Sequence, residues 1–263
     1  MKQSTKLLSA AVLALALSAE TSAFAGSVLI VNGSSQTSEP GTTADITGNL
    51  STLHTAVGNV VTVSDAIPAD LTPFSQIWDI RFSNVFALSA SERANYVSYM
   101  AGGGGMFVMG ENSAFAPRNT SVLGLISEVG GGNLGFTVPS STQDVLAPFT
   151  GPNPVTQITY AAPGGVALNA PGTGDWITKT SGVDEGTGIA FGVGDMPNAP
   201  AGALTVIFDV NFMQNLYDLP NSQNLTKNLI NFVGVQVGVP DSSSSLALFG
   251  TVVCGFLILR RKN

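Results

Sequence analysis

Three acidic residues, each at or near the carboxyl end of a predicted strand, have the side chains best suited to chemistry: Asp79, Glu111 and Asp209. Parallel strands present their carboxyl ends at one edge of a sheet, so we expect these carboxylates to share that edge. Together with Arg81 and Arg118 they are candidates for binding a polar ligand or a hard cation such as Ca²⁺. The alternative, which we prefer, is that Asp79 with Arg81, or Glu111 with Arg118, form structural ion pairs.

A second candidate group, Asn112 and Ser113, occupies the turn after a predicted strand. An activated serine needs a base within hydrogen-bond reach, and besides carboxylates only His54, Lys179 and Lys227 could serve. Nothing in the spacing places them near Ser113, and a lone histidine is poor evidence for a metal site. We therefore predict no catalytic residue, no metal and no cofactor. Asn112 and Ser113 are expected to cap the next segment or complete the turn, and they remain candidates for ligand contacts.

The glycine run Gly102–Gly105 invites comparison with a phosphate-binding loop. However, no Gly-Lys-Ser/Thr follows it, and it ends a predicted helix instead of beginning one. We interpret the run as the signal that stops the helix.

Alternating strands and helices must position all of these residues. The predicted strands are Ser27–Val31, Asn59–Val63, Gln76–Phe82, Met106–Met109 and Leu204–Asp209, and the predicted helices are Ala44–Val57, Ser89–Met100, Ser121–Val129 and Gln223–Val235. The second helix is the clearest, because Ser89 and Glu92 have the spacing of a capping box. This alternation predicts an α/β fold of three layers, a mostly parallel sheet with helices on both faces.

The segment from about residue 134 to 201 interrupts the alternation with short extended pieces separated by Pro and Gly. No linker of uniform composition sets it apart from the rest. We therefore predict an irregular β-rich insertion within a single domain, residues 26–238.

Residues 1–25 have the three parts of a secretory signal peptide. Lys2 and Lys6 supply the positive charge, an apolar run follows, and a small-residue site ends at Ala25, before Gly26. We expect signal peptidase to cleave between Ala25 and Gly26.

The other end of the chain, residues 239–263, has a second apolar run. Val239, Pro240, Asp241 and Ser242 come first, an apolar stretch fills 246–259, and Arg260, Arg261 and Lys262 follow. The stretch predicts a short membrane helix, although about 20 residues are usual for spanning a bilayer. Because Lys and Arg beside a membrane segment stay on the cytoplasmic side, the body is expected outside the cytoplasm.

This tail resembles the PEP-CTERM class of bacterial sorting signals, in the variant that begins Val-Pro-Asp-Ser-Gly; Ser243 replaces the glycine. The resemblance covers about 25 residues and implies processing by an exosortase, a membrane protease that cleaves near Pro240 and Asp241. It further implies a membrane-anchored precursor, a mature protein at the cell surface or in the extracellular matrix, and extracellular polysaccharide as a partner. The alternative is a plain C-terminal anchor.

The body resembles the class I glutamine amidotransferase-like fold, a flavodoxin-like sheet also used by trehalose-utilisation-type domains. The resemblance rests on Trp78–Arg81, the Ser89–Met100 helix, the strand and turn at Met106–Gly110, and Phe208–Phe212 before the final helix. In that family the turn carries a nucleophilic Cys served by a later His. Here Asn112 takes the nucleophile position and no His follows His54, so the resemblance implies a domain without glutamine hydrolysis.

The charged residues and the cysteine count limit the kinds of partner and chemistry that the body can have. Charged residues are only 10% of the 263, and between Gly26 and Pro240 there are 15 acids against five bases, a net charge of −10. Such a body has no basic surface for phosphates, so we exclude nucleic acid. The only cysteine is Cys254, in the tail, which leaves the body without a disulfide or thiol nucleophile. We expect an exported, non-catalytic binding or structural protein; the alternative is an extracytoplasmic enzyme that acts on saccharides through carboxylates.

Overall fold

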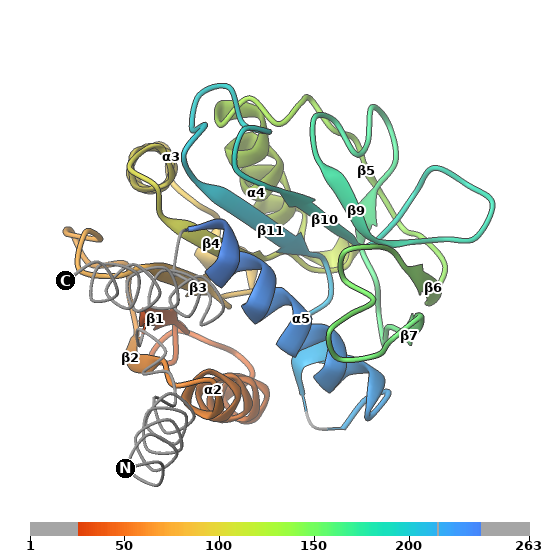
Figure 1. Ribbon diagram of the computed structural model, residues 1–263, viewed down its shortest axis with the longest axis horizontal. Helices are drawn as coiled ribbons and strands as arrows, with labels where there is room; N and C mark the ends of the chain where they lie inside the picture. Colours follow the sequence, from red (N-terminus) through yellow and green to blue (C-terminus); the bar gives the residue numbers. More distant parts are fainter. Residues whose placement is uncertain (1–25, 215, 238–263) are drawn as a thin grey trace, which may run out of the picture. The chain divides into compact units, whose positions relative to one another are not determined.

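The computed structural model describes residues 26–214 and 216–237, and the largest element of this part is a nine-stranded sheet with the order β2-β1-β3-β4-β11-β10-β9-β6-β7 (Figure 1). The first five strands in this order are mutually parallel. They are β2 (Val60–Ser64), β1 (Ser27–Val31), β3 (Gln76–Asp79), β4 (Gly105–Met109) and β11 (Ala203–Ile207). The strands β1, β3, β4 and β11 are almost entirely buried, which explains the apolar runs of β1 and β4, whereas β3 also buries the polar residues Gln76 and Asp79.

Helices cover both faces of the sheet. Helices α2 (Pro40–Ala56) and α5 (Asn221–Gln236) pack on one face, where Leu50 and Leu229 share a core with Trp78. Helices α3 (Ala90–Ala101) and α4 (Ala116–Glu128) pack on the other, where Met100 and Leu125 share a second core. The predicted α/β class with three layers is therefore present in the described residues.

The insertion between α4 and β11 continues the main sheet, and in this respect the prediction of a mostly parallel sheet was too simple. Its strands β10 (Gly188–Phe191), β9 (Asp175–Lys179), β6 (Thr142–Val145) and β7 (Gln157–Thr159) all pair antiparallel. A separate two-stranded sheet joins β5 (Phe136–Thr137) to β8 (Gly165–Val166). The sheet is thus mixed, because hairpin-type returns replace helical crossovers in this segment.

Local signals set the helix boundaries. Ser89 caps α3 as predicted, since its hydroxyl accepts from the amide of Glu92 and the Glu92 carboxylate accepts from the amide of Ser89. Helices α2 and α4 begin four and five residues before their predicted starts. Each has proline in its first turn, where the fixed φ and missing N–H suit a helix start.

The predicted signal peptide, residues 1–25, and the predicted tail, residues 239–263 with its apolar helix 246–259, lie outside the described residues. Within 26–214 and 216–237, no helix is long and apolar enough to cross a membrane.

Candidate functional site

The carboxyl edge of three adjacent parallel strands holds the three predicted carboxylates. Asp79 is the last residue of β3, Glu111 follows β4 by two residues, and Asp209 follows β11 by two. Because β3, β4 and β11 are neighbours in the sheet, the prediction of a shared edge was right. The side chains nevertheless divide into two separate groups, each with its own partners.

The first group is the Asp79 network, which consists of Asp79, Arg81, Glu92, Tyr96 and Arg118. Asp79 is 0% exposed. The guanidinium of Arg81 donates two hydrogen bonds to the carboxylate of Asp79, from Nε to Oδ1 at 2.9 Å and from Nη2 to Oδ2 at 2.8 Å. The hydroxyl of Tyr96 donates to Oδ2 at 3.0 Å, and Arg81 Nη1 reaches outward to Glu92 Oε1 at 3.2 Å.

Arg118 completes the Asp79 network from α4. It is 0% exposed, its Nη2 lies 3.4 Å from Asp79 Oδ1, and its Nε and Nη1 donate to the backbone carbonyls of Met109 and Phe86 at 2.9 Å each. Burial alone would raise the pKa of Asp79, but Arg118 and Arg81 outweigh it and hold the pKa at about 2. Asp79 is therefore an ionised carboxylate whose oxygens are occupied by the protein itself.

The second group is the Glu111 cluster, formed by Glu111, Asn112, Asn119 and Asp209. Glu111 Oε2 accepts from the backbone amide of Asn112 at 2.7 Å, and Oε1 accepts from the amide of Val210, next to Asp209, at 3.3 Å. Asn119 holds the turn, because its amide group donates to the carbonyls of Glu111 and Asn112 at 2.8 and 2.9 Å. Asp209 accepts from the amides of Ala162 and Asn211 at 3.0 and 2.8 Å.

Burial dominates the electrostatics of the Glu111 cluster. It raises the pKa of Glu111 to about 8, with the negative charge of Asp209 adding to the effect, and it raises the pKa of Asp209 to about 6. The two side chains are 1% and 0% exposed. Glu111 is thus largely protonated at neutral pH, which is an unusual state for a carboxyl group and one that enzymes use for acid catalysis.

The turn that would carry a nucleophile is unstrained. Asn112 has φ −63° and ψ 177°, an ordinary extended conformation, and its side chain accepts from the amide of Ala114 at 3.0 Å. It thereby caps the short helix η2 (Ser113–Phe115), as predicted for this pair. His54, the only histidine, is buried in α2, where its Nδ1 is 3.0 Å from the side-chain nitrogen of Asn59 and its ring meets Trp78 edge-on.

One of the two predicted ion pairs forms and the other does not. Asp79 pairs with Arg81 as predicted, but the predicted pair of Glu111 with Arg118 is absent, because Arg118 reaches Asp79 instead.

Sequence reasoning missed Tyr96 and Asn119. The available signal for Tyr96 was its hydroxyl, because a buried tyrosine needs a polar partner. Among the described residues no group of three or more His, Cys, Asp or Glu could hold a metal ion.

Comparison with known proteins identifies the C-terminal tail. Residues 238–262 match the family model described as the VPDSG-CTERM motif. The chain carries an exosortase-type sorting signal. This sorting signal is typical of exported proteins and supports a transient membrane anchor before processing. No curated protein matches the chain.

Solved structures match the body by fold. The "mmIFT52 N-terminal domain" aligns with a TM-score of 0.56 at 11% identity, over 78% of this chain and 96% of that one. A ThuA-like protein from Bacteroides uniformis has a TM-score of 0.47 at 14% identity, over 86% and 97% of the two chains. An exo-β-1,4-mannosidase from an Opitutaceae bacterium has a TM-score of 0.49 at 14% identity, over 86% of this chain and 38% of that one. The first match shows a shared fold and nothing about activity.

Proposed function

We propose that this chain is an exported, exosortase-processed bacterial protein whose body acts without catalysis, as a binding or structural component at the cell surface or in the extracellular matrix. The observation that carries the proposal is the VPDSG-CTERM match at residues 238–262. In this scheme signal peptidase cleaves between Ala25 and Gly26, and the tail holds an inner-membrane precursor until an exosortase acts. Extracellular polysaccharide is the proposed partner of the mature protein.

The sorting residues have separate roles in the proposal. Val239, Pro240, Asp241 and Ser242 form the recognition and cleavage segment, and Arg260 and Arg261 keep the end of the chain on the cytoplasmic side. The body, which we propose to be amidotransferase-like, would be the part that is delivered.

The geometry of the predicted site supports a non-catalytic body. Asp79 is enclosed by Arg81, Arg118 and Tyr96 and has no oxygen facing solvent. At the turn, Asn112 uses its side chain to cap η2. Each group is thus engaged in holding the carboxyl edge of the sheet together, which is a structural task.

Mass spectrometry of the protein from exosortase-bearing cells tests the export proposal. We expect a mature species that begins at Gly26 and lacks 246–263. Replacing Pro240 and Asp241 together by alanine should leave the tail attached, whereas the control Ser244→Ala, just beyond the recognition segment, should be processed normally.

Three outcomes would contradict the export proposal. The first is an intact C-terminus in exosortase-bearing cells, and the second is normal processing of the Pro240→Ala, Asp241→Ala double variant. The third is loss of the tail in cells without exosortase, which would assign the cleavage to another protease.

A second candidate function, an extracytoplasmic enzyme acting on saccharides, is favoured by one observation. The raised pKa of Glu111, about 8, beside Asp209 gives the acid and base pairing that glycoside hydrolysis uses. Their burial counts against it. Hydrolysis of aryl glycosides by the full-length chain, abolished in Glu111→Gln and in Asp209→Asn, would establish the enzyme; no hydrolysis, or hydrolysis unchanged by both substitutions, would reject it.

A further inference from the structure

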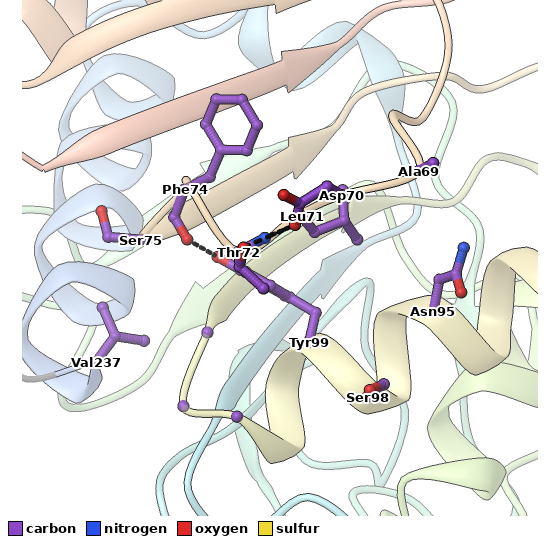
Figure 2. Close-up of a pocket in the computed structure, with 13 residues that line it drawn as sticks. Ala69, Asp70, Leu71, Thr72, Phe74, Ser75, Asn95, Ser98, Tyr99 and Val237 are labelled. Carbon is purple, nitrogen blue, oxygen red and sulfur yellow. Dashed lines mark hydrogen bonds between the residues drawn. The ribbon is translucent and has the colours of Figure 1, made fainter.

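A cavity of about 330 Å³ lies at the amino edge of the sheet, opposite to the edge that holds Asp79, Glu111 and Asp209. It is lined by the residues that immediately precede β3, by the glycines that precede β4, and by one side of α3. Figure 2 shows the loop with Asp70 and Thr72 facing the helix that carries Asn95, Ser98 and Tyr99. The volume of the cavity is at the lower end of the range for small-molecule sites.

The walls of this cavity are held in place by packing and by a hydrogen bond within the protein. Leu71 is buried and anchors the loop in the same core as α3. The hydroxyl of Tyr99 donates to the carbonyl of Phe74 at 3.1 Å, which ties the helix to the loop. The ring of Tyr99 covers Gly104 so closely that a Cβ there would lie 2.2 Å from a ring carbon. Gly104 is therefore needed for this wall, in addition to the part of the run in stopping the helix.

Anions do not fit this cavity. The amides of Gly102, Gly103 and Gly104 donate to the carbonyls of Ser98, Met100 and Tyr99, at 3.1, 2.9 and 3.1 Å, so these amides are not free to cradle a phosphate. No Lys, Arg or His is among the lining residues of the described chain. The phosphate-loop interpretation of the glycine run is thus excluded by its hydrogen bonds as well as by its sequence.

The one charged group in the wall is the carboxylate of Asp70. The backbone amide and the hydroxyl of Thr72 both donate to its Oδ1, at 2.9 and 2.7 Å. These bonds lower the pKa of Asp70 and fix the direction of the carboxylate, while Oδ2 takes no part in them. Asn95 and Ser98, both exposed, add an amide and a hydroxyl on the opposite wall.

We propose that this cavity binds a small molecule carrying a primary ammonium group, held by Asp70 with Asn95 and Ser98 as neutral hydrogen-bond partners. An ammonium has three donors and a positive charge, which match a wall with one fixed carboxylate and no cation. The net charge of −10 on the body favours the approach of a cation. This inference rests on the cavity and is independent of the export proposal.

Glucosamine and glucose are a matched pair of probes, because they have the same ring and size and differ in one ammonium against one hydroxyl. Calorimetric titration would use the full-length chain, at mildly acidic pH, in a non-ionic detergent without a sugar headgroup. We expect glucosamine to bind up to about fivefold more tightly than glucose, which is the upper end of what one exposed ion pair contributes.

Asp70→Asn is the sharpest variant, because the amide oxygen can still accept both bonds from Thr72 while the charge is removed. We expect it to bind glucosamine no better than glucose. Asp45→Asn, which removes the same charge from an exposed site on α2, should leave the preference unchanged. Ser98→Phe, which fills the cavity from an exposed helical position, should abolish binding of both probes.

Several results would overturn the proposal. These are equal affinity for glucose and glucosamine, no detectable binding of glucosamine, an unchanged preference in Asp70→Asn, or an equal loss in Asp45→Asn. A thermal melt of each variant shows whether the fold is retained, and a loss of binding in an Asp70→Asn chain that melts normally is the decisive positive result.

Discussion

At the scale of single residues, the described structure depends on charges that are buried and paired. Asp79 neutralises much of the charge of Arg81 and Arg118, both of which are almost fully enclosed. Removing one partner of such a network costs more than the pairing itself contributes, because the remaining charges stay buried without compensation.

We expect Asp79→Asn to lower the free energy of unfolding by about 3–5 kcal/mol, the cost of uncompensated buried charge. Urea denaturation measures it. The control Glu128→Gln breaks the more exposed pair with Arg93, 2.8 Å apart, and should cost at most about 1 kcal/mol. Similar losses in the two variants would show that the Asp79 network contributes no more to the free energy of unfolding than an exposed ion pair does.

Glu111 gives a pH-dependent prediction. Its pKa is 4.5 in the reference state and about 8 in the fold, so its contribution to stability is complete below pH 4.5 and is lost as the pH rises from 4.5 to about 8. The loss is about 1.4 kcal/mol for each pH unit in that window. We expect Glu111→Gln to flatten this decline in a series of thermal melts. A decline of the same slope in both proteins would assign it to other groups.

At the scale of elements, α3 links three features of the body. Its capping box fixes where it begins, Tyr96 donates to Asp79, and Tyr99 forms a wall of the cavity at the amino edge. The start of this helix therefore sets the register of residues that act at opposite ends of the sheet.

Ser89→Ala should lower the free energy of unfolding by about 1 kcal/mol, because the amide of Glu92 loses its acceptor. Ser98→Ala, at an exposed position in the same helix, should be neutral or slightly stabilising because alanine is the better helix former. Denaturant titration of the two variants makes the comparison. Equal effects would mean that the cap does not fix the helix start.

At the scale of the whole body, the parallel and antiparallel halves of the sheet form one continuous hydrogen-bonded ladder. The strand β10 pairs with β11 over four residue pairs, and Phe191 is fully buried in the same core as α3 and α4. The insertion thus shares its core with the rest of the body, as expected if it is not an independent domain.

Native-state hydrogen exchange can test this cooperativity. We expect the amides of β4 and β10 to exchange through the same global opening, and those of β7, at the edge of the sheet, to exchange at lower free energy. Measurement over a series of denaturant concentrations resolves the two classes. If β10 lost protection in an earlier, separate step than β4, the insertion would be an independent folding unit.

The sequence predicted the features that depend on local patterns. The apolar runs, the spacing of Ser89 and Glu92 and the alternation of strand and helix predicted the α/β class, the capped helix and the edge of the sheet at which Asp79, Glu111 and Asp209 lie. The predicted starts of α2 and α4 were four and five residues too late, because Pro40 and Pro117 fit the first turn of a helix.

The sequence by itself determined how this protein is sorted, because a sorting signal is recognised by other proteins along a short, continuous segment, here residues 238–262. Only the tertiary structure decided which charges pair. Arg118 reaches Asp79, 39 positions away, and among the described residues no cation forms an ion pair with Glu111, which is nearer to Arg118 in the sequence. The reason is geometric: Arg118, in the first turn of α4, lies at the carboxyl ends of β3 and β4, where it meets Asp79 and the carbonyl of Met109. Side-chain neighbours are thus set by packing between elements and not by distance along the chain.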